Sequence, residues 1–260
     1  MTDSQKKTAL ITGSATGVGA ATALQLAQRG WNVVVNYSRS EQEAQETAAA
    51  CRAAGADALV LQADVAQDAD CRRLVEGAVG RWGRLDALVN NAGTSVFGDE
   101  ARWEVVDGEV VQRILGVNAV GTFQMVRAAV PHLKAAQGSI VNVSSVAGAL
   151  GIGSSIPYIA SKGAINSMTL HLARSLAPEI RVNAVCPGFI TSRWFARGLG
   201  EAAADKARQT YESTVPLSRA STPEDVAESI VWLVTGARTV TGELVLLDSG
   251  THLGGDWRRR

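Results

Sequence analysis

The chain has 260 residues, of which 46% are hydrophobic and 19% charged, as in an ordinary globular protein with a sizeable core. Its 25 basic residues balance 25 acidic ones, which excludes a global field that would attract nucleic acid or acidic membranes. No apolar segment reaches the roughly 20 residues needed to cross a bilayer, and the polar N-terminus predicts no signal peptide, so we expect a cytoplasmic protein.

Short β-rich runs alternate with longer helical patterns along the chain. The runs cover residues 8–12, 32–36, 58–62, 87–90, 139–144, 181–186 and 243–248. The helical patterns cover residues 17–29, 41–54, 68–82, 107–134, 157–177 and 223–235. This alternation is typical of βαβ units and predicts an α/β fold whose parallel sheet carries helices on both faces. No linker or repeat divides the chain, so we expect one domain over residues 1–260.

Ligands of such sheets bind outside the carboxyl ends of the strands. Segments rich in Gly, Ser, Thr or Asn follow five predicted strands: residues 12–19, 36–39, 90–93, 144–148 and 187–192. We expect a binding site where these segments meet. Three scattered cysteines, Cys51, Cys71 and Cys186, fit neither a disulfide framework nor a zinc-ligand pattern, so no metal site is predicted.

The first of these segments reads TGSATGVG and joins the first strand to the first helix. Glycine permits a sharp turn and a close approach to pyrophosphate, and a helix N-terminus offers free N–H groups. The spacing is GxxxGxG, which is not the best-known dinucleotide fingerprint. Its place after the first strand favours a phosphate site over an empty turn. The candidate contacts are Gly13, Ser14, Thr16, Gly17, Val18 and Gly19.

The end of the second predicted strand commonly selects the nucleotide, because an acid there binds the ribose hydroxyls and an arginine favours a 2′-phosphate. Here the chain reads Tyr37-Ser38-Arg39, with no acid before Glu41. The pattern favours NADP(H) over NAD(H). In the alternative interpretation, Arg39 is an exposed charge ahead of the next helix.

Tyr158 and Lys162 lie four residues apart at the start of a predicted helix, so both side chains leave the same face. Taken alone, the pair is most simply a surface contact. Together with TGSATGVG, NNAG (90–93) and the serine of VNVSSVAG, however, it resembles the short-chain dehydrogenase/reductase family, in its single-domain branch. The resemblance covers nearly the whole chain. It implies a Rossmann-type, doubly wound sheet of seven strands that binds NAD or NADP and interconverts carbonyls and alcohols, commonly in a homotetramer.

The family's catalytic residues correspond to Tyr158, Lys162, Ser145 and Asn118. The resemblance implies that Tyr158 is the general acid/base and that Ser145 hydrogen-bonds the substrate oxygen. Lys162 would hold the nicotinamide ribose, and Asn118 would position a water that relays protons. A phenol has a pKa near 10, and we expect the neighbouring Lys162 ammonium and a positive nicotinamide to lower it.

The resemblance also implies further cofactor contacts. They are Asp64 and Val65 at the adenine, Asn90, Asn91, Ala92 and Gly93 along the cofactor, and Pro187, Gly188, Ile190 and Thr191 at the nicotinamide. The run VVVNYSRS is similar to the 3-oxoacyl-acyl-carrier-protein reductases. Those enzymes bind an acidic carrier protein through basic residues just before the fifth strand and after the Tyr–Lys helix. At these places this chain has only Lys134, which is thin for such a patch, and a carrier protein as partner stays open. The final predicted strand ends in Asp248-Ser249-Gly250, where the commoner pattern is D-G-G.

Three other classes compete with this interpretation. A Ser/His hydrolase would need a GxSxG elbow, which the chain lacks. A nucleotide sensor or scaffold built on an inactive reductase would typically have lost the tyrosine or the lysine. A sugar epimerase would carry a TGxxGxxG turn and a larger C-terminal region. The substrate is expected to contact residues 192–215, whose aromatics suit an apolar or ring-bearing molecule or simply pack this segment onto the body.

The predicted helices 107–134 and 157–177 are candidates for contacts between subunits. The second carries apolar residues beyond its sheet-facing side, namely Ile159, Ile165, Met168, Leu170 and Leu172. Apolar surface left over on a helix usually meets a partner. We therefore expect a homotetramer, or at least a dimer, assembled through these helices.

Overall fold

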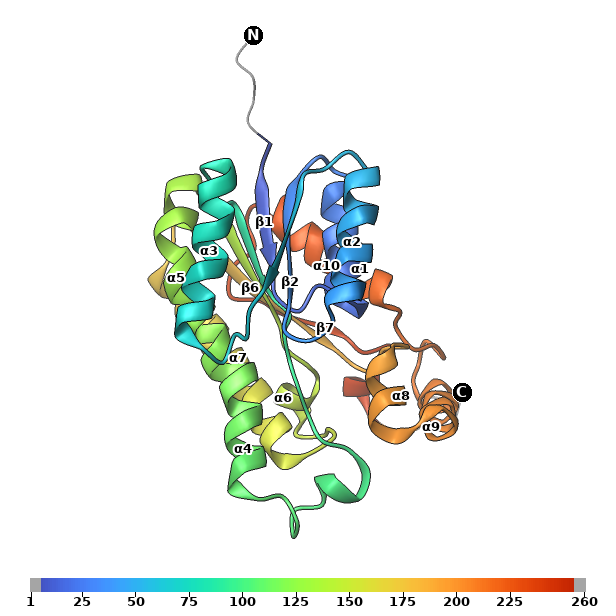
Figure 1. The fold of residues 1–260 in the computed structure, drawn as a ribbon. Helices are drawn as coiled ribbons and strands as arrows, with labels where there is room; N and C mark the ends of the chain where they lie inside the picture. Colours follow the sequence, from blue (N-terminus) through green and yellow to red (C-terminus); the bar gives the residue numbers. More distant parts are fainter. Residues whose placement is uncertain (1–5, 255–260) are drawn as a thin grey trace.

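The computed structural model describes residues 6–254, so the outermost residues of the predicted 1–260 domain lie outside it. A parallel sheet of seven strands runs through these residues in the order β3-β2-β1-β4-β5-β6-β7 (Figure 1). The strands are β1 (Thr8–Ile11), β2 (Asn32–Tyr37), β3 (Ala58–Gln62), β4 (Ala87–Asn90), β5 (Ser139–Val143), β6 (Arg181–Pro187) and β7 (Leu244–Leu247). The predicted doubly wound α/β fold is confirmed.

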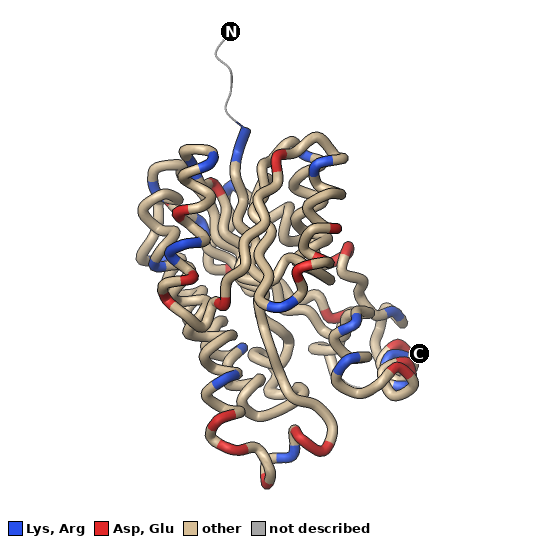
Figure 2. The backbone as a smooth tube through the Cα atoms, in the orientation of Figure 1, with Lys and Arg blue, Asp and Glu red and all other residues tan. Residues whose placement is uncertain are grey.

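Helices cover both faces of the sheet (Figure 1). One face packs against α1 (Gly17–Ala27), α2 (Glu41–Ala53) and α10 (Pro223–Thr235), and the other against α3 (Asp68–Trp82), α5 (Gly121–Ala136) and α7 (Ile156–Ser175). The strands carry almost no charge, whereas Lys, Arg, Asp and Glu lie along the helices and loops (Figure 2). This distribution follows from burial of both faces of a parallel sheet.

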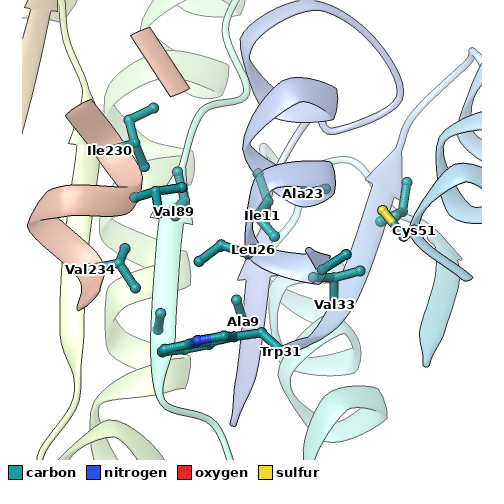
Figure 3. Packing of buried hydrophobic residues seen from close by; sticks show 14 of the residues in the cluster. Ala9, Ile11, Ala23, Leu26, Trp31, Val33, Cys51, Val89, Ile230 and Val234 are labelled. Carbon is teal, nitrogen blue, oxygen red and sulfur yellow. The ribbon is translucent and has the colours of Figure 1, made fainter. Parts of the chain in front are cut away.

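The core has one apolar cluster on each side of the sheet. Figure 3 shows part of the first cluster, where Leu26 of α1 and Ile230 of α10 meet strand residues such as Val89. Val33, Val89 and Leu26 are fully buried, so their side chains contribute about 1.5–3 kcal/mol each relative to exposure. All three cysteines are free and buried. No helix in the described part of the chain is long and apolar enough to span a membrane.

Most predicted boundaries agree with the structure to within one or two residues, but the predicted helix 107–134 is wrong as one continuous helix. The structure has α4 (Gly108–Leu115), a π-helical turn η2 (Gly116–Val120) and then α5, which continues to Ala136. The turn η2 makes i→i+5 hydrogen bonds and contains Asn118. The side chain of Asn118 is buried and contacts the loop after β4 and helix α7, which apolar periodicity did not indicate.

Several short elements were not predicted. They are η1 (Gly98–Ala101), α6 (Ala147–Leu150), α8 (Arg193–Leu199), α9 (Glu201–Thr214) and η3 (Thr251–Leu253). Neither α8 nor α9 has a buried residue, so neither helix needs an apolar stripe of helical period. That stripe is the signal from which the other helices were predicted. Both helices lie in the connection from β6 to α10, beside the carboxyl ends of the strands (Figure 1).

Candidate active site

The phosphate turn follows β1 at the point where the strand order reverses between β1 and β4. Gly13 has a φ of 62°, and a Cβ there would lie 3.0 Å from the Cα of Ala92, so only glycine fits. The next helix, α1, begins after Thr16, whose side chain makes no capping hydrogen bond. The first N–H groups of α1 therefore have no side-chain cap where they border the cleft. This geometry fits the phosphates of a nucleotide.

Two predicted contacts of this turn do not line the cleft. The Oγ of Ser14 is fully buried, donates to the carbonyl of Ile11 at 2.7 Å and accepts from the N–H of Asn36 at 2.9 Å. It ties β1 to β2. A Cβ on Gly19 would lie 2.6 Å from Nδ2 of Asn91, so this glycine permits close packing of α1 on the sheet.

The end of β2 forms the next part of the wall. Tyr37, Ser38 and Arg39 all line the cleft, with Tyr37 buried and Arg39 exposed. Arg39 makes no ion pair with any carboxylate of residues 6–254. The helix α2 begins after Ser40, whose side chain makes no capping hydrogen bond. A cation and uncapped N–H groups thus adjoin the place expected for a 2′-phosphate.

The segment after β3 places Asp64 and Val65 at the cleft, and the segment after β4 places Asn91, Ala92 and Gly93 there. Asn90, which was predicted to lie along the cofactor, does not line the cleft. Its side chain is buried and donates to Oδ1 of Asn142 on β5 at 2.9 Å, so it joins two strands inside the sheet.

Helix α7 carries the Tyr–Lys pair. Ser155 caps the helix by accepting from the N–H of Tyr158, and Pro157 suits the first turn because its missing N–H needs no partner. Lys162 is only 4% exposed and donates from Nζ to the carbonyl of Val143 at 2.8 Å. Nζ also lies 5.5 Å from the centroid of the Tyr158 ring. Lys162 is buried, Tyr158 is half-buried and both line the cleft, so the pair is not a surface contact.

Burial shifts the pKa values of both Lys162 and Tyr158. It lowers the pKa of Lys162 to about 8, because a charged ammonium is poorly solvated inside the protein. It raises the pKa of Tyr158 above its ordinary value, and the hydrogen bond with the Ser145 hydroxyl opposes that rise only in part. The protein by itself therefore does not lower the pKa of the phenol as expected. Any net lowering has to come from a bound positive group.

Asn118 of η2 is fully buried and does not line the cleft. Its Oδ1 accepts from the N–H of Thr94 at 2.8 Å, and its Nδ2 donates to the carbonyl of Thr94 at 3.0 Å and to Oγ of Ser161 at 2.9 Å. The side chain thus fixes the loop after β4 against α7, one turn from Tyr158. Its predicted role in holding a relay water stays a prediction.

The segment that follows β6 forms another part of the cleft wall. Pro187, Gly188, Ile190 and Thr191 all line the cleft. The Oγ of Ser145 lies 3.4 Å from the carbonyl of Pro187 and accepts from the N–H of Ala147 at 3.1 Å, which keeps the hydroxyl next to Tyr158. A Cβ on Gly188 would lie 2.5 Å from the phenolic oxygen of Tyr211, so glycine lets α9 approach the sheet.

Aromatic side chains surround the end of the cleft beside Tyr158. Trp194 of α8 lies 6.5 Å from the Tyr158 ring and 6.0 Å from Phe97, measured between centroids. Phe195 stacks on Phe189 at 4.2 Å. Trp194, Phe195 and Tyr211 of the expected segment 192–215 line the cleft, and their contact with a substrate stays a prediction. Phe97 and Phe189 were missed, because one lies in a loop without a pattern and the other inside the run PGFIT.

All these parts line one cleft of about 1980 Å³. It brings together three of the four predicted catalytic residues, Ser145, Tyr158 and Lys162, and most predicted cofactor contacts; Ser14, Gly19 and Asn118 lie behind its wall. Residues 6–254 contain no group of three or more His, Cys, Asp or Glu that could hold a metal. The arrangement offers a turn suited to anions, a half-buried phenol next to a hydroxyl, and an apolar recess beside them.

Known proteins resemble the chain over almost its whole length. The family model described as enoyl-(acyl carrier protein) reductase matches residues 13–252. A Streptomyces violaceoruber protein named as a ketoacyl reductase of the granaticin polyketide synthase is 46% identical, over 94% of this chain and 96% of the relative. The 3-oxoacyl-[acyl-carrier-protein] reductase FabG of Staphylococcus aureus (strain N315) is 34% identical, over 95% and 98%. A crystal structure designated a short-chain dehydrogenase/reductase from Burkholderia xenovorans superposes with a TM-score of 0.89 at 41% identity, covering 97% of this chain and 100% of that one.

The burial of Lys162 predicts a measurable pH dependence of stability. Its pKa is about 8 in the folded chain and about 10.4 in the unfolded chain, so the unfolded chain binds more protons between these values. The Lys162 contribution to the unfolding free energy is least favourable below about pH 8 and improves as the pH rises. Relative to Lys162→Met, the parent should gain about 2 kcal/mol between about pH 7 and about pH 9.5.

Urea unfolding of both proteins at the two pH values measures this difference. Cys51 and Cys71, whose pKa values burial raises, contribute the opposite slope equally in both proteins, so their contribution cancels. The Lys162 charge lowers the pKa of Cys186, so both proteins carry Cys186→Ala in this comparison. Lys134→Met, at an exposed lysine of α5, is the matched control and should follow the parent. A constant difference between parent and Lys162→Met would show that the ammonium is solvated.

Proposed function

The chain belongs to the short-chain dehydrogenase/reductase family of oxidoreductases, and we propose that it interconverts a carbonyl and a secondary alcohol with Tyr158 as the general acid/base. The observation that carries this proposal is the placement of the Tyr158 phenol. It lies in the cleft next to the Ser145 hydroxyl, one turn from the buried Lys162, and shares that cleft with the phosphate turn. A sensor or scaffold has no use for this grouping.

In the proposed mechanism a bound nicotinamide dinucleotide supplies or accepts the hydride. Tyr158 donates its phenolic proton to the carbonyl oxygen during reduction and takes it back during oxidation. Ser145 donates a hydrogen bond to the same oxygen, where negative charge develops in the transition state. Burial keeps the proton on Tyr158 until the reactants are assembled, since it raises the pKa of the phenol. Lys162 stabilises the phenolate that remains.

The proposed cofactor is NADP(H). Arg39 is exposed at the end of β2, lines the cleft and has no ion pair among the described residues. Glu41, the first acid after β2, does not line the cleft, which argues against a carboxylate that binds the ribose hydroxyls there. Thr16 to Val18 would hold the pyrophosphate, Asp64 and Val65 would contact the adenine, and Thr191 would lie at the nicotinamide.

The proposed substrate is an apolar or ring-bearing ketone or alcohol, because Phe97 and Trp194 line the cleft next to Tyr158. A 3-oxoacyl thioester is a second candidate, favoured by the relatives named as ketoacyl and 3-oxoacyl reductases. We propose that one domain in the cytoplasm carries this activity, which the three free cysteines support. A panel of ketones, 3-oxoacyl thioesters and alcohols, followed by absorbance of the reduced cofactor, tests the substrate class.

Replacement of the phenol tests the mechanism. Tyr158→Phe keeps the ring packing and loses only the transferable proton, so turnover should fall by about a hundredfold to ten-thousandfold. The affinity for NADPH, measured by fluorescence titration, should stay close to that of the parent, as should the melting temperature. Turnover within tenfold of the parent would contradict the assignment of Tyr158 as general acid/base.

Arg39→Ala tests the nucleotide choice. A charge-assisted hydrogen bond to phosphate is worth about 1.5–3 kcal/mol, so the preference for NADPH over NADH should fall by about one to two orders of magnitude. Ser38→Asp should go further by repelling the phosphate, and Ser38 is exposed, whereas a carboxylate at the buried Tyr37 would be desolvated. Titration of parent and variants with both cofactors measures the preference. Equal affinities in the parent would place Arg39 in solvent.

The proposed homotetramer, or at least dimer, rests on apolar side chains exposed on the predicted helices. Phe123 of α5 is 49% exposed and Leu170 of α7 is 39% exposed, whereas Ile165 is buried within the fold and offers no contact surface. Phe123→Glu combined with Leu170→Glu should shift the sedimentation coefficient toward the monomer. A parent that sediments as a monomer at micromolar concentration would contradict the proposal.

A further inference from the structure

Helix α8 is attached to the nucleotide side of the cleft by two ion pairs. Arg193 and Arg197, one turn apart on α8, each place a guanidinium nitrogen 3.5 Å from Oε1 of Glu43 on α2. All three side chains line the cleft. Both arginine side chains are about 60% exposed, so these long, solvated ion pairs are weak.

The same helix is attached to the opposite wall by apolar packing. The rings of Trp194 and Phe195 lie 6.0 and 5.7 Å from that of Phe97 in the loop after β4. A Cβ on Gly198 would lie 2.3 Å from the Phe97 ring, so α8 approaches that loop as closely as glycine permits. Apolar contacts thus position α8 across the cleft, and its two arginines reach the nucleotide side without being needed for the closure itself.

Glu43 lies on the first turn of α2, directly after the segment that would meet a 2′-phosphate. That segment holds Ser38 and Arg39, and no side chain caps α2. A dianion bound there would come close to Glu43, which repels it, and to the arginines that Glu43 holds. Guanidinium groups bind phosphate better than they bind a solvated carboxylate at 3.5 Å.

We propose that Arg193 and Arg197 join Arg39 as cations of the 2′-phosphate site, and that Glu43 holds them while no phosphate is bound. The proposal rests on the proposed binding of NADP(H) and adds to it a nucleotide contact made by the helix that also carries Trp194 beside Tyr158. Closure of α8 over the substrate is then favoured by NADPH more than by NADH.

The test compares the parent with the double variant Arg193→Met and Arg197→Met, which keeps most of the aliphatic length. Fluorescence titrations give the affinities for NADPH and NADH. The probes adenosine 2′,5′-bisphosphate and AMP differ only in the 2′-phosphate, so the ratio of their affinities measures the contribution of that group. The double variant should lose about tenfold or more in affinity for NADPH and for the bisphosphate. Its affinities for NADH and AMP should stay within about twofold of the parent.

Arg208→Met is the matched control, because Arg208 lines the same cleft from α9 but is held by Asp205 and Glu212. It should leave the ratio of the two affinities unchanged. Glu43→Gln removes the repulsion and the competing partner, so it should bind NADPH several-fold more tightly and NADH as the parent does. If Glu43 served only to hold α8 closed, this variant would weaken both cofactors equally.

The outcomes separate this inference from the nucleotide choice on which it rests. If the parent prefers NADPH and Arg39→Ala reduces that preference, but the α8 variants do not, the inference is wrong and the nucleotide choice stands. An equal loss of NADPH and NADH affinity in the double variant would place the arginines on the pyrophosphate and would also overturn it. A parent without preference for NADPH overturns both.

Discussion

The burial of the Lys162 ammonium is the constraint on which the site depends. An unpaired cation inside a protein is costly, and this one is compensated by a single hydrogen bond to the backbone of β5. The segments around Lys162 pack closely against its backbone. The Ser144 hydroxyl donates to the carbonyl of Lys162, and a Cβ on Gly148 would lie 2.4 Å from the Lys162 carbonyl carbon. Strand β5, helix α6 and helix α7 therefore hold the lysine, and the lysine fixes the side of α7 that faces the cleft.

Buried amides extend this organisation across the carboxyl ends of the strands. Asn36 accepts from the N–H of Gly13 and thereby links β2 to the phosphate turn. Asn142 accepts from Asn90 and donates to Thr169, which connects β4, β5 and α7. Asn118 performs the same task between the loop after β4 and α7. Such networks favour one arrangement of the elements, because a shifted element would break these buried hydrogen bonds. Only Oδ1 of Asn90 is without a partner among these described amides.

The sequence predicts the fold well because strand and helix periods alternate without interruption. The strand-end rule indicates where a site would lie, because parallel strands bring their carboxyl ends to one edge, whereas the individual residues were assigned from the resemblance to the family. What it does not predict depends on tertiary contacts. The role of Asn90 could not be read from NNAG, since only the pairing of β4 with β5 turns it inward. The π-helical turn at Asn118 and the helices α8 and α9 leave no periodic apolar signal. The ion pairs of Glu43 could not be predicted either, because an acid in a first helical turn is common and its two arginine partners lie at least 150 residues further along the chain.

The two sides of the cleft differ in how firmly they are built. The side proposed for the nucleotide consists of strand ends, a glycine turn and a buried lysine. Hydrogen bonds fix the turn to β2 and the lysine of α7 to β5. The wall proposed for the substrate consists of α8 and α9, which contribute no buried residue. It contacts the body through rings, solvated ion pairs and the hydrogen bond from the Tyr211 hydroxyl to the carbonyl of Asp248. Elements with few buried contacts open at low free-energy cost. Under the proposed function, a rigid nucleotide site beside a more easily displaced substrate wall would let one scaffold keep its chemistry while the wall adapts to the molecule that is reduced or oxidised.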